Sequence, residues 1–167
     1  MGVLPAYKES FFCSPDRADG LQLTMLYEDG LVSCEMNINN RFEGYTDVVH
    51  GGMLFGVLDV MIWYAIFMAT KKICMTRKTE MEYFKPVLCN HPYVAKVRFL
   101  AVEERDFLSE GWIEDRHGQI CARVNALFRE GKDISVEKFV KKFDFSYAAP
   151  EIRDYFLSLL DEERKEA

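Results

Sequence analysis

The chain has 167 residues, of which 49% are hydrophobic and 29% are charged, a balance typical of one soluble domain with its own core. Its formal net charge of -6 at pH 7 argues against a nucleic-acid partner, which requires a positive surface for the phosphates. We therefore expect no nucleic-acid binding.

The chain is expected to lack targeting and metal-binding signals. The first twenty residues contain no apolar run of signal-peptide length, and Ala6 stands where a myristoylation motif requires Ser or Thr. The five cysteines form no C-x-x-C pair, and the three histidines share no metal-ligand spacing. We expect a cytoplasmic protein with reduced, buried thiols, no metal and no cofactor.

Two strands are predicted near the start of the chain. Residues 21–28 and 31–39 alternate apolar and polar side chains, the period of a strand with one buried face. Asp29-Gly30 between them is a two-residue hairpin signal, because glycine readily adopts positive φ. We expect the two strands to pair antiparallel.

A long apolar helix is predicted after a loop at 40–49. In residues 53–69 every residue except Asp59 is apolar or glycine. A Gly-Gly pair at 51–52 marks the beginning of the helix, and a Lys-Lys pair at 71–72 supplies cations suited to its C-terminus. The apolar run is short for a membrane span, and an aspartate near the centre of a span costs about 3 kcal/mol. We therefore expect a helix buried in protein and no membrane span.

Four further strands are predicted after the helix. They cover roughly residues 75–84, 93–103, 107–114 and 119–129. This order of elements packs most simply as an antiparallel sheet wrapped around one apolar helix, an α+β architecture. Two short amphipathic pieces within 132–167 are expected to pack on the outside of the same domain.

Asp59 is chemically out of place in its helix. An ionised carboxylate in apolar surroundings is costly unless it is paired, hydrogen-bonded or partly neutral. No basic residue lies within four positions of it on the helix. Two interpretations are open: a core aspartate bonded to backbone or to a hydroxyl, or a base or nucleophile tuned by burial.

Gly51 and Gly52 begin the helix without side chains. Unpaired N–H groups at a helix start carry the positive end of the helix dipole, so a substrate carbonyl oxygen can approach them closely. Such donors stabilise an oxyanion. The alternative is a tight turn that merely needs glycine.

Several motifs stand in a specific order between residues 42 and 118. They are Phe42-Glu43-Gly44-Tyr45, Val49-His50-Gly51-Gly52, Leu58-Asp59, Thr76, Tyr83, Pro86, Glu114-Asp115 and Gly118. Together they resemble the hotdog-fold thioesterases of the phenylacetate-degradation type. The resemblance covers about residues 20–130. It leaves the C-terminal tail unexplained. We expect a single hotdog domain over 1–167, in which the amphipathic pieces form a helical extension over about 132–167.

The resemblance also implies an activity, the hydrolysis of acyl thioesters, commonly of coenzyme A. Gly52 is then expected to polarise the thioester carbonyl through its N–H, and Asp59 to act as general base or nucleophile. His50 is expected to orient the site, and Thr76 to hold the carboxylate or the water. Gly51 is expected to contact the substrate.

Two further positions are expected to lie near the substrate. Gly44 stands six residues before the histidine, where many relatives carry Asn or Gln, and Asn39 and Asn40 are the nearest amides that could substitute. Trp63 either lines an acyl pocket or belongs to the core, as aromatic residues at helical spacing usually do.

Helix geometry adds an expectation about assembly. Asp59 lies seven residues beyond Gly52, about 10 Å along the axis at 1.5 Å per residue. One chain cannot easily place both on one carbonyl. If both act on the same thioester, Gly52 comes from one subunit and Asp59 from another, as when two such helices face each other antiparallel across a twofold axis. We expect an obligate homodimer, and the resemblance implies that such dimers often pair into tetramers.

Three functions remain open from the sequence. The first is an acyl-CoA thioesterase. The second is a non-catalytic acyl-CoA or lipid binder on the same fold, for which the missing amide at Gly44 speaks. The third is a dehydratase or hydratase of this fold, which the His50-Gly51-Gly52 sequence fits poorly.

Overall fold

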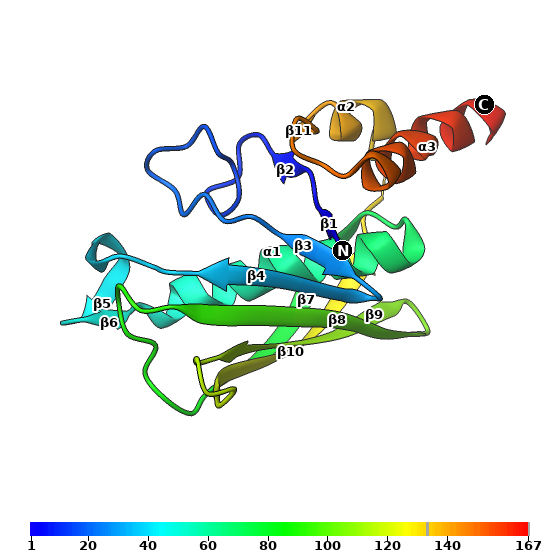
Figure 1. The fold of residues 1–167 in the computed structure, drawn as a ribbon. Coiled ribbons are helices and arrows are strands. Elements are labelled where there is room, and N and C mark those ends of the chain that lie inside the picture. The colour runs from blue at the N-terminus through cyan, green and yellow to red at the C-terminus, as the bar shows by residue number, and fades with distance from the viewer. Residues whose placement is uncertain (133, 167) are drawn as a thin grey trace. The chain divides into compact units, whose positions relative to one another are not determined.

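The computed structural model describes residues 1–132 and 134–166. Its strands are β1 (Gly2–Val3), β2 (Ala6–Tyr7), β3 (Leu26–Glu28), β4 (Leu31–Met36), β5 (Glu43–Tyr45), β6 (Val48–Val49), β7 (Cys74–Tyr83), β8 (Tyr93–Glu103), β9 (Asp106–Glu114), β10 (Ile120–Glu130) and β11 (Phe143–Asp144). Its helices are α1 (Gly51–Thr70), α2 (Val136–Val140), α3 (Pro150–Glu166) and the 3-10 helix η1 (Asn40–Phe42). Figure 1 labels the strands and the α-helices along the chain.

The chain divides into two compact units. Residues 30–130 form the first, which contains α1 and an antiparallel sheet in the order β4-β8-β9-β10-β7. Residues 1–29 and the described part of 131–167 form the second, in which β1 pairs with β3 and β2 pairs with β11. The amphipathic pieces predicted near the C-terminus fold as α2 and α3 of this second unit.

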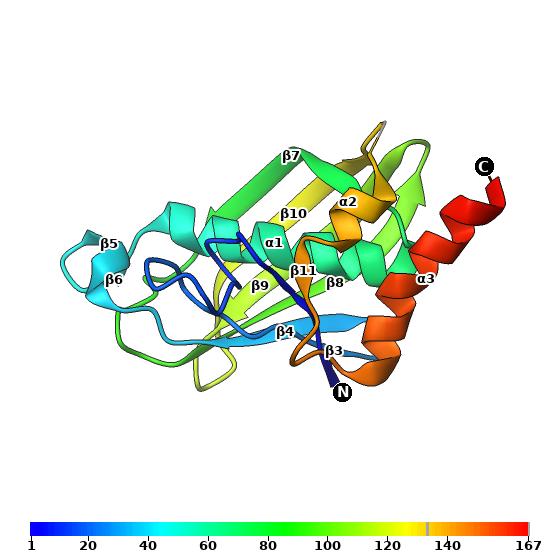
Figure 2. The ribbon, with the colours of Figure 1, turned by 90° about the horizontal axis from the view of Figure 1, so that it is seen from above.

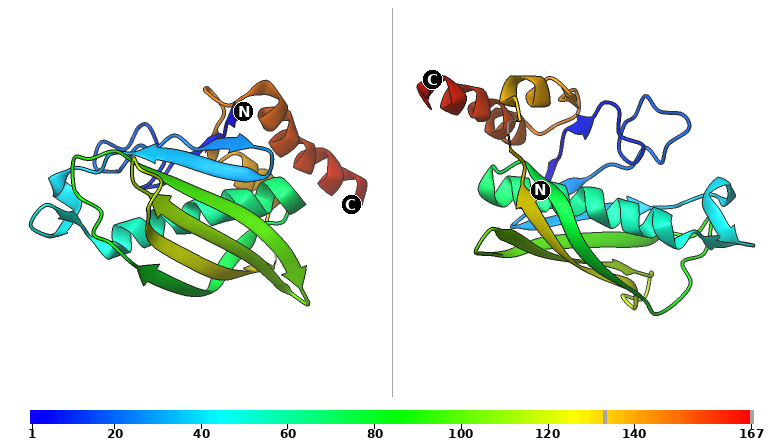
Figure 3. Two further views of the ribbon diagram at one scale, coloured as in Figure 1. Left: turned by 60° about the horizontal axis from the view of Figure 1, so that its bottom comes forward. Right: turned by 180° about the vertical axis from the view of Figure 1, so that it is seen from behind.

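In the first unit, α1 runs along one face of the sheet, as Figures 2 and 3 show. Along β9, every second side chain is buried, which is the period of a strand with one face covered. Gly111 of β9 lets the sheet and α1 approach each other closely. A Cβ atom there would lie only 2.7 Å from Val97 Cγ2 and 3.3 Å from Leu58 Cδ2 of α1.

Helix α1 begins and ends at the positions predicted from the sequence. His50 is its N-cap, and Lys71 ends it in the left-handed conformation with φ 58°, donating its N–H to Phe67 O at 2.8 Å. The helix is long and apolar enough to cross a membrane, but 56% of its most apolar window is buried inside the protein. Burial of this kind is what a core helix requires.

Strand β7 is the last strand of the sheet, and β10 is its neighbour among the described residues. Ladder pairing with β10 runs from Cys74 to Tyr83, with a register shift beside Leu127 and Phe128. The other edge of this ten-residue strand therefore presents backbone N–H and C=O groups that the described chain leaves unpaired.

Two predictions about the first fifty residues need correction. Residues 21–25 are not a strand, although they alternate, because Leu21 and Leu23 donate their N–H groups to carbonyls of the preceding loop at 2.9 Å. Residues 40–49 are not an irregular loop but contain η1 and the small β5–β6 ladder. The predicted turn is present: Asp29 and Gly30 have φ of 48° and 83°.

All five cysteines are free and buried, as predicted. They are Cys13, Cys34, Cys74, Cys89 and Cys121. Burial raises the pKa of the Cys74 thiol to about 12, with Glu130 contributing in the same direction. These side chains are therefore thiols that fill the core.

Candidate functional site

The start of α1 carries the histidine and the two glycines of the predicted site. Gly52 donates its N–H to His50 Nδ1 at 2.9 Å, so the imidazole acts as the cap of the helix. The prediction of an unpaired amide is therefore wrong for Gly52. A ring nitrogen two residues upstream can reach this N–H, and Gly52 has no side chain to keep it away.

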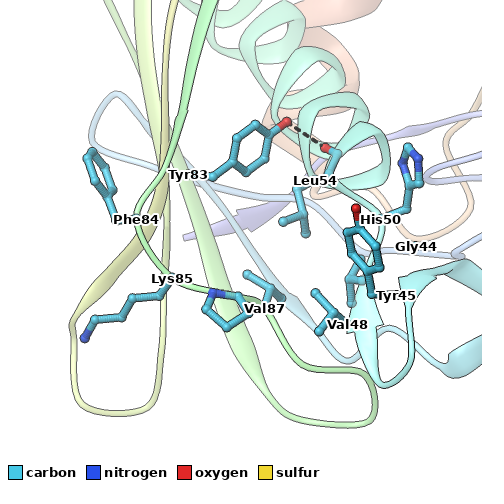
Figure 4. A pocket seen from close by; sticks show the side chains of 12 residues that line it. Gly44, Tyr45, Val48, His50, Leu54, Tyr83, Phe84, Lys85 and Val87 are labelled. Atoms are coloured by element: carbon cyan, nitrogen blue, oxygen red, sulfur yellow. Dashed lines mark hydrogen bonds between the residues drawn. The ribbon is translucent and has the colours of Figure 1, made fainter.

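The carbonyl of Gly51 is held by a side chain from the sheet. Tyr83, the last residue of β7, donates its hydroxyl to Gly51 O at 2.9 Å, as the dashed line in Figure 4 marks. A Cβ atom on Gly51 would lie 3.2 Å from three atoms of the tyrosine, so only glycine fits without displacing the ring. The close approach of β7 explains the need for glycine here.

Asp59 lies about two turns further along α1, at 3.6 residues per turn, and contacts β7. Thr76 donates its hydroxyl to Asp59 Oδ1 at 2.6 Å. Burial raises the pKa of the Asp59 carboxyl, while the hydrogen bond from Thr76 opposes that rise. Oδ2 has no hydrogen-bond partner among the described residues. The structure thus brings together two of the predicted site residues and leaves one carboxylate oxygen available.

One face of α1 carries Gly52, Gly56, Asp59 and Trp63, at successive spacings of four, three and four residues. Each of the four is exposed or half-buried, whereas most of the remaining helix is buried. This set is called the α1 stripe below. Its residues are apolar or lack a side chain, except for the carboxylate of Asp59.

Trp63 belongs to this stripe and stacks on the buried ring of Phe67, with centroids 5.1 Å apart and an interplanar angle of 11°. It is not part of the lining of the pocket described next. The placement of Trp63 therefore gives no support to its prediction as a pocket residue.

A pocket of about 590 Å³ lies beside the start of α1. Its lining comprises Gly44, Tyr45, Val48, Val49, His50, Gly51, Leu54, Tyr83, Phe84, Lys85, Pro86 and Val87, most of which Figure 4 labels. Three aromatic side chains at its walls are strongly exposed: Tyr45 (83%), Tyr83 (52%) and Phe84 (52%). Asp59 and Thr76 are not among the lining residues.

The pocket residues also show what the sequence did not reveal. The sequence indicates Tyr83 only through its place in a motif, since no local pattern predicts a hydrogen bond from a strand end to a helix start. Within the described residues, no group of three or more His, Cys, Asp or Glu side chains is arranged to hold a metal ion.

Comparisons with known proteins place this geometry in context. No protein family model matches the chain. An uncharacterised protein of Schizosaccharomyces pombe is 29% identical over 104 residues, a match that spans 59% of each chain. Among solved structures, a thioesterase superfamily protein superposes with a TM-score of 0.70 at 23% identity, over 74% of this chain and 61% of that one.

Two further solved structures are similar. The E. coli PaaI protein from the phenylacetic acid degradation operon superposes with a TM-score of 0.60 at 13% identity, over 66% of this chain and 80% of that one. The smu.793 protein of Streptococcus mutans, whose structure is bound to acetyl CoA, also gives 0.60, at 15% identity, over 65% of this chain and 88% of that one. The chain has the hotdog fold. The predicted α+β architecture is therefore confirmed.

At Gly44 this chain differs from the family motif that its sequence otherwise resembles, in which Asn or Gln is common. A Cβ atom on Gly44 would lie 3.1 Å from His50 Cδ2 and 3.2 Å from His50 Cα, so the histidine occupies the space that an amide side chain would need. The nearby amides are engaged elsewhere. Asn39 accepts the N–H of Arg41 at 3.0 Å, and Asn40 donates to Asp47 at 3.0 Å.

Proposed function

We propose that this hotdog protein is an acyl-CoA thioesterase that hydrolyses a thioester to a carboxylic acid and coenzyme A. The observation that carries the proposal is the Asp59–Thr76 pair, a half-buried carboxylate whose pKa is raised by burial and whose position is fixed by a hydroxyl. A carboxylate that is a stronger base than usual is suited to removing a proton from water. The acetyl-CoA bound to the Streptococcus mutans relative supports a coenzyme A ester as substrate.

The reaction assigns roles to two residues of the α1 stripe, Asp59 and Gly52. Asp59 either takes a proton from a water molecule that attacks the carbonyl carbon, or attacks that carbon itself. In both cases the carbonyl oxygen gains negative charge, which the Gly52 N–H stabilises. The C–S bond then breaks, and the thiolate of coenzyme A leaves and takes up a proton. Where water attacks, the acid forms directly; where Asp59 attacks, the acyl group is left on Asp59 as an anhydride, which water then hydrolyses to the acid and free Asp59.

Binding at Gly52 requires a change of partner. The Gly52 N–H donates to His50 Nδ1 in the free protein, so an incoming carbonyl oxygen replaces the imidazole as acceptor. One hydrogen bond is exchanged for another, and His50 is exposed, so water can solvate the ring when it turns away. Between turnovers, His50 Nδ1 therefore accepts the hydrogen bond from the Gly52 N–H at the start of the helix.

Two features support the composite site of a homodimer. The α1 stripe leaves apolar surface and Asp59 only half covered in one chain, and β7 beside it has an unpaired edge. Pairing of two copies through these surfaces buries apolar area and satisfies backbone groups together. An antiparallel arrangement of two α1 helices then sets Asp59 of one copy opposite Gly52 of the other.

Release of thiol from a panel of acyl-CoA esters tests the proposal. We expect turnover of at least one ester by the wild-type protein and a loss of roughly 100-fold or more in Asp59→Ala, because general base and nucleophilic groups contribute this much. Asp16→Ala, which removes an exposed aspartate from the second unit, serves as the matched control and is expected to retain wild-type activity. Absence of turnover on every ester would remove the proposal. An Asp59→Ala variant as fast as wild type would remove the role of Asp59.

A second candidate is a non-catalytic acyl-CoA binder. The glycine at position 44 and the engaged N–H of Gly52 favour it, because both reduce the number of donors ready for a thioester oxygen. This candidate predicts saturable binding of an acyl-CoA by calorimetry with no thiol release over hours. The same panel therefore separates the two functions.

A further inference from the structure

We propose that Tyr83 is a positioning residue that fixes and polarises the peptide group carrying the Gly52 N–H. This inference rests on the proposed function, because it concerns the donor expected to bind the thioester oxygen. The geometry that points to it is the bond from the Tyr83 hydroxyl to Gly51 O at 2.9 Å.

The carbonyl of Gly51 and the N–H of Gly52 belong to one peptide group. Three residues are thus joined in a continuous chain: the Tyr83 hydroxyl donates to Gly51 O, and the Gly52 N–H donates to His50 Nδ1 at 2.9 Å. A donor on a carbonyl draws electron density from the amide nitrogen and makes the N–H of the same peptide a stronger donor, by about 10–30% per bond in condensed-phase estimates. The tyrosine hydroxyl therefore acts on the oxyanion donor without touching the substrate oxygen.

The contact between Tyr83 and Gly51 sets the position of the 51–52 peptide group as well as its polarity. The carbonyl oxygens of a helix accept one bond from the residue four positions later, which leaves a second lone pair for the tyrosine. The ring of Tyr83 lies against Gly51, where a Cβ atom would be only 3.2 Å from it. The plane of the 51–52 peptide is therefore held from two sides, by packing and by the hydrogen bond.

The phenol is suited to remain a donor. Burial raises the pKa of the Tyr83 hydroxyl above its ordinary value, so it stays protonated at neutral pH. Tyr83 also ends β7, the strand that carries Thr76, the partner of Asp59. One strand thereby holds both groups that its chain contributes, the carboxylate to one composite site and the oxyanion donor to the other.

Tyr83→Phe tests the inference because it keeps the ring that packs on Gly51 and removes only the hydroxyl. We expect kcat to fall roughly 3- to 10-fold with KM changed less than about twofold, the effect of one neutral hydrogen bond felt mainly in the transition state. We also expect the Gly52 amide proton to move upfield in a ¹⁵N-glycine-labelled NMR spectrum, because the N–H becomes a weaker donor. Tyr147→Phe removes a hydroxyl from an exposed side chain in the second unit and is expected to change neither value.

The two readouts separate this inference from the proposed function. An unchanged Gly52 amide resonance overturns the inference whether or not the wild type hydrolyses any ester. A shifted resonance together with wild-type kcat overturns the positioning role in catalysis. If no ester is hydrolysed by wild type, the proposed thioesterase fails, and the amide resonance alone still decides whether Tyr83 polarises the peptide.

Discussion

Mixing two inactive variants tests whether the site is shared between subunits. Asp59→Asn removes the base while its amide oxygen can still accept the Thr76 hydroxyl. Gly52→Pro removes the N–H, and proline is tolerated there because the first turn of a helix does not use its N–H groups in the helix ladder. Each variant alone is expected to lose nearly all activity, with circular dichroism and sedimentation unchanged.

The magnitude of recovery follows from the position of the two groups on α1. They lie seven residues apart, about 10 Å along the axis, so the composite site takes one group from each chain. A mixed dimer of the two variants then has one intact site and one site with both defects. Mixed dimers isolated through two different affinity tags are expected to show about half of the wild-type kcat per dimer, and a randomly paired mixture about a quarter.

Thiol release from the best ester of the panel measures this recovery. Dimers that carry both tags but contain only one of the two variants give the baseline activity. Isolated mixed dimers that stay at that baseline would refute the reasoning, because Gly52 and Asp59 would then have to act within one chain. A fully active monomer in sedimentation would refute it by another route.

Three other outcomes are expected. Asp59→Asn is expected to raise the melting temperature at pH 7 but not near pH 3. The pKa of Asp59 is raised in the folded protein, so the ionised carboxylate destabilises the fold once the pH rises through that pKa, whereas the protonated form at low pH does not. Scanning calorimetry at both pH values should show a rise of roughly 2–4 °C per kcal/mol gained. Thr76→Val raises the pKa of Asp59 further by removing the opposing hydrogen bond, so the acidic limb of kcat/KM moves to higher pH, whereas Thr79→Val on the same strand leaves it in place. Gly111→Ala costs about 1–3 kcal/mol in urea unfolding, because its Cβ would meet Val97 Cγ2 at 2.7 Å, and an unchanged midpoint would contradict this.

The sequence predicts the central part of the fold because two different patterns are visible there. Residues 53–69 are too uniformly apolar for a half-exposed strand, and the four strand-like segments that follow are separated by turns. Residues 21–25 alternate between apolar and polar side chains, but the N–H groups of Leu21 and Leu23 bond to carbonyls of the preceding loop. The local sequence pattern does not indicate these tertiary hydrogen bonds. The β5–β6 ladder contains strands of three and two residues, which are too short for any period to show.

The sequence predicts some residues of the candidate site better than others. Asp59 stands out from the sequence alone, because a single charge in an apolar run always needs an explanation. Thr76 was found only through resemblance to a family motif. The bonds made by Tyr83 and His50 depend on how β7 approaches α1 and on one side-chain rotamer, and neither has a sequence signal.

The burial of all five cysteines has a practical consequence for work with this chain. Only a thiolate that a reagent can reach reacts quickly with it, and thiols enclosed in the core are out of its reach. Native protein should therefore add almost no background colour when liberated coenzyme A is titrated with such a reagent. Once the chain is denatured, the same reagent should detect five equivalents per molecule, so one inexpensive chemical reports both catalysis and loss of structure.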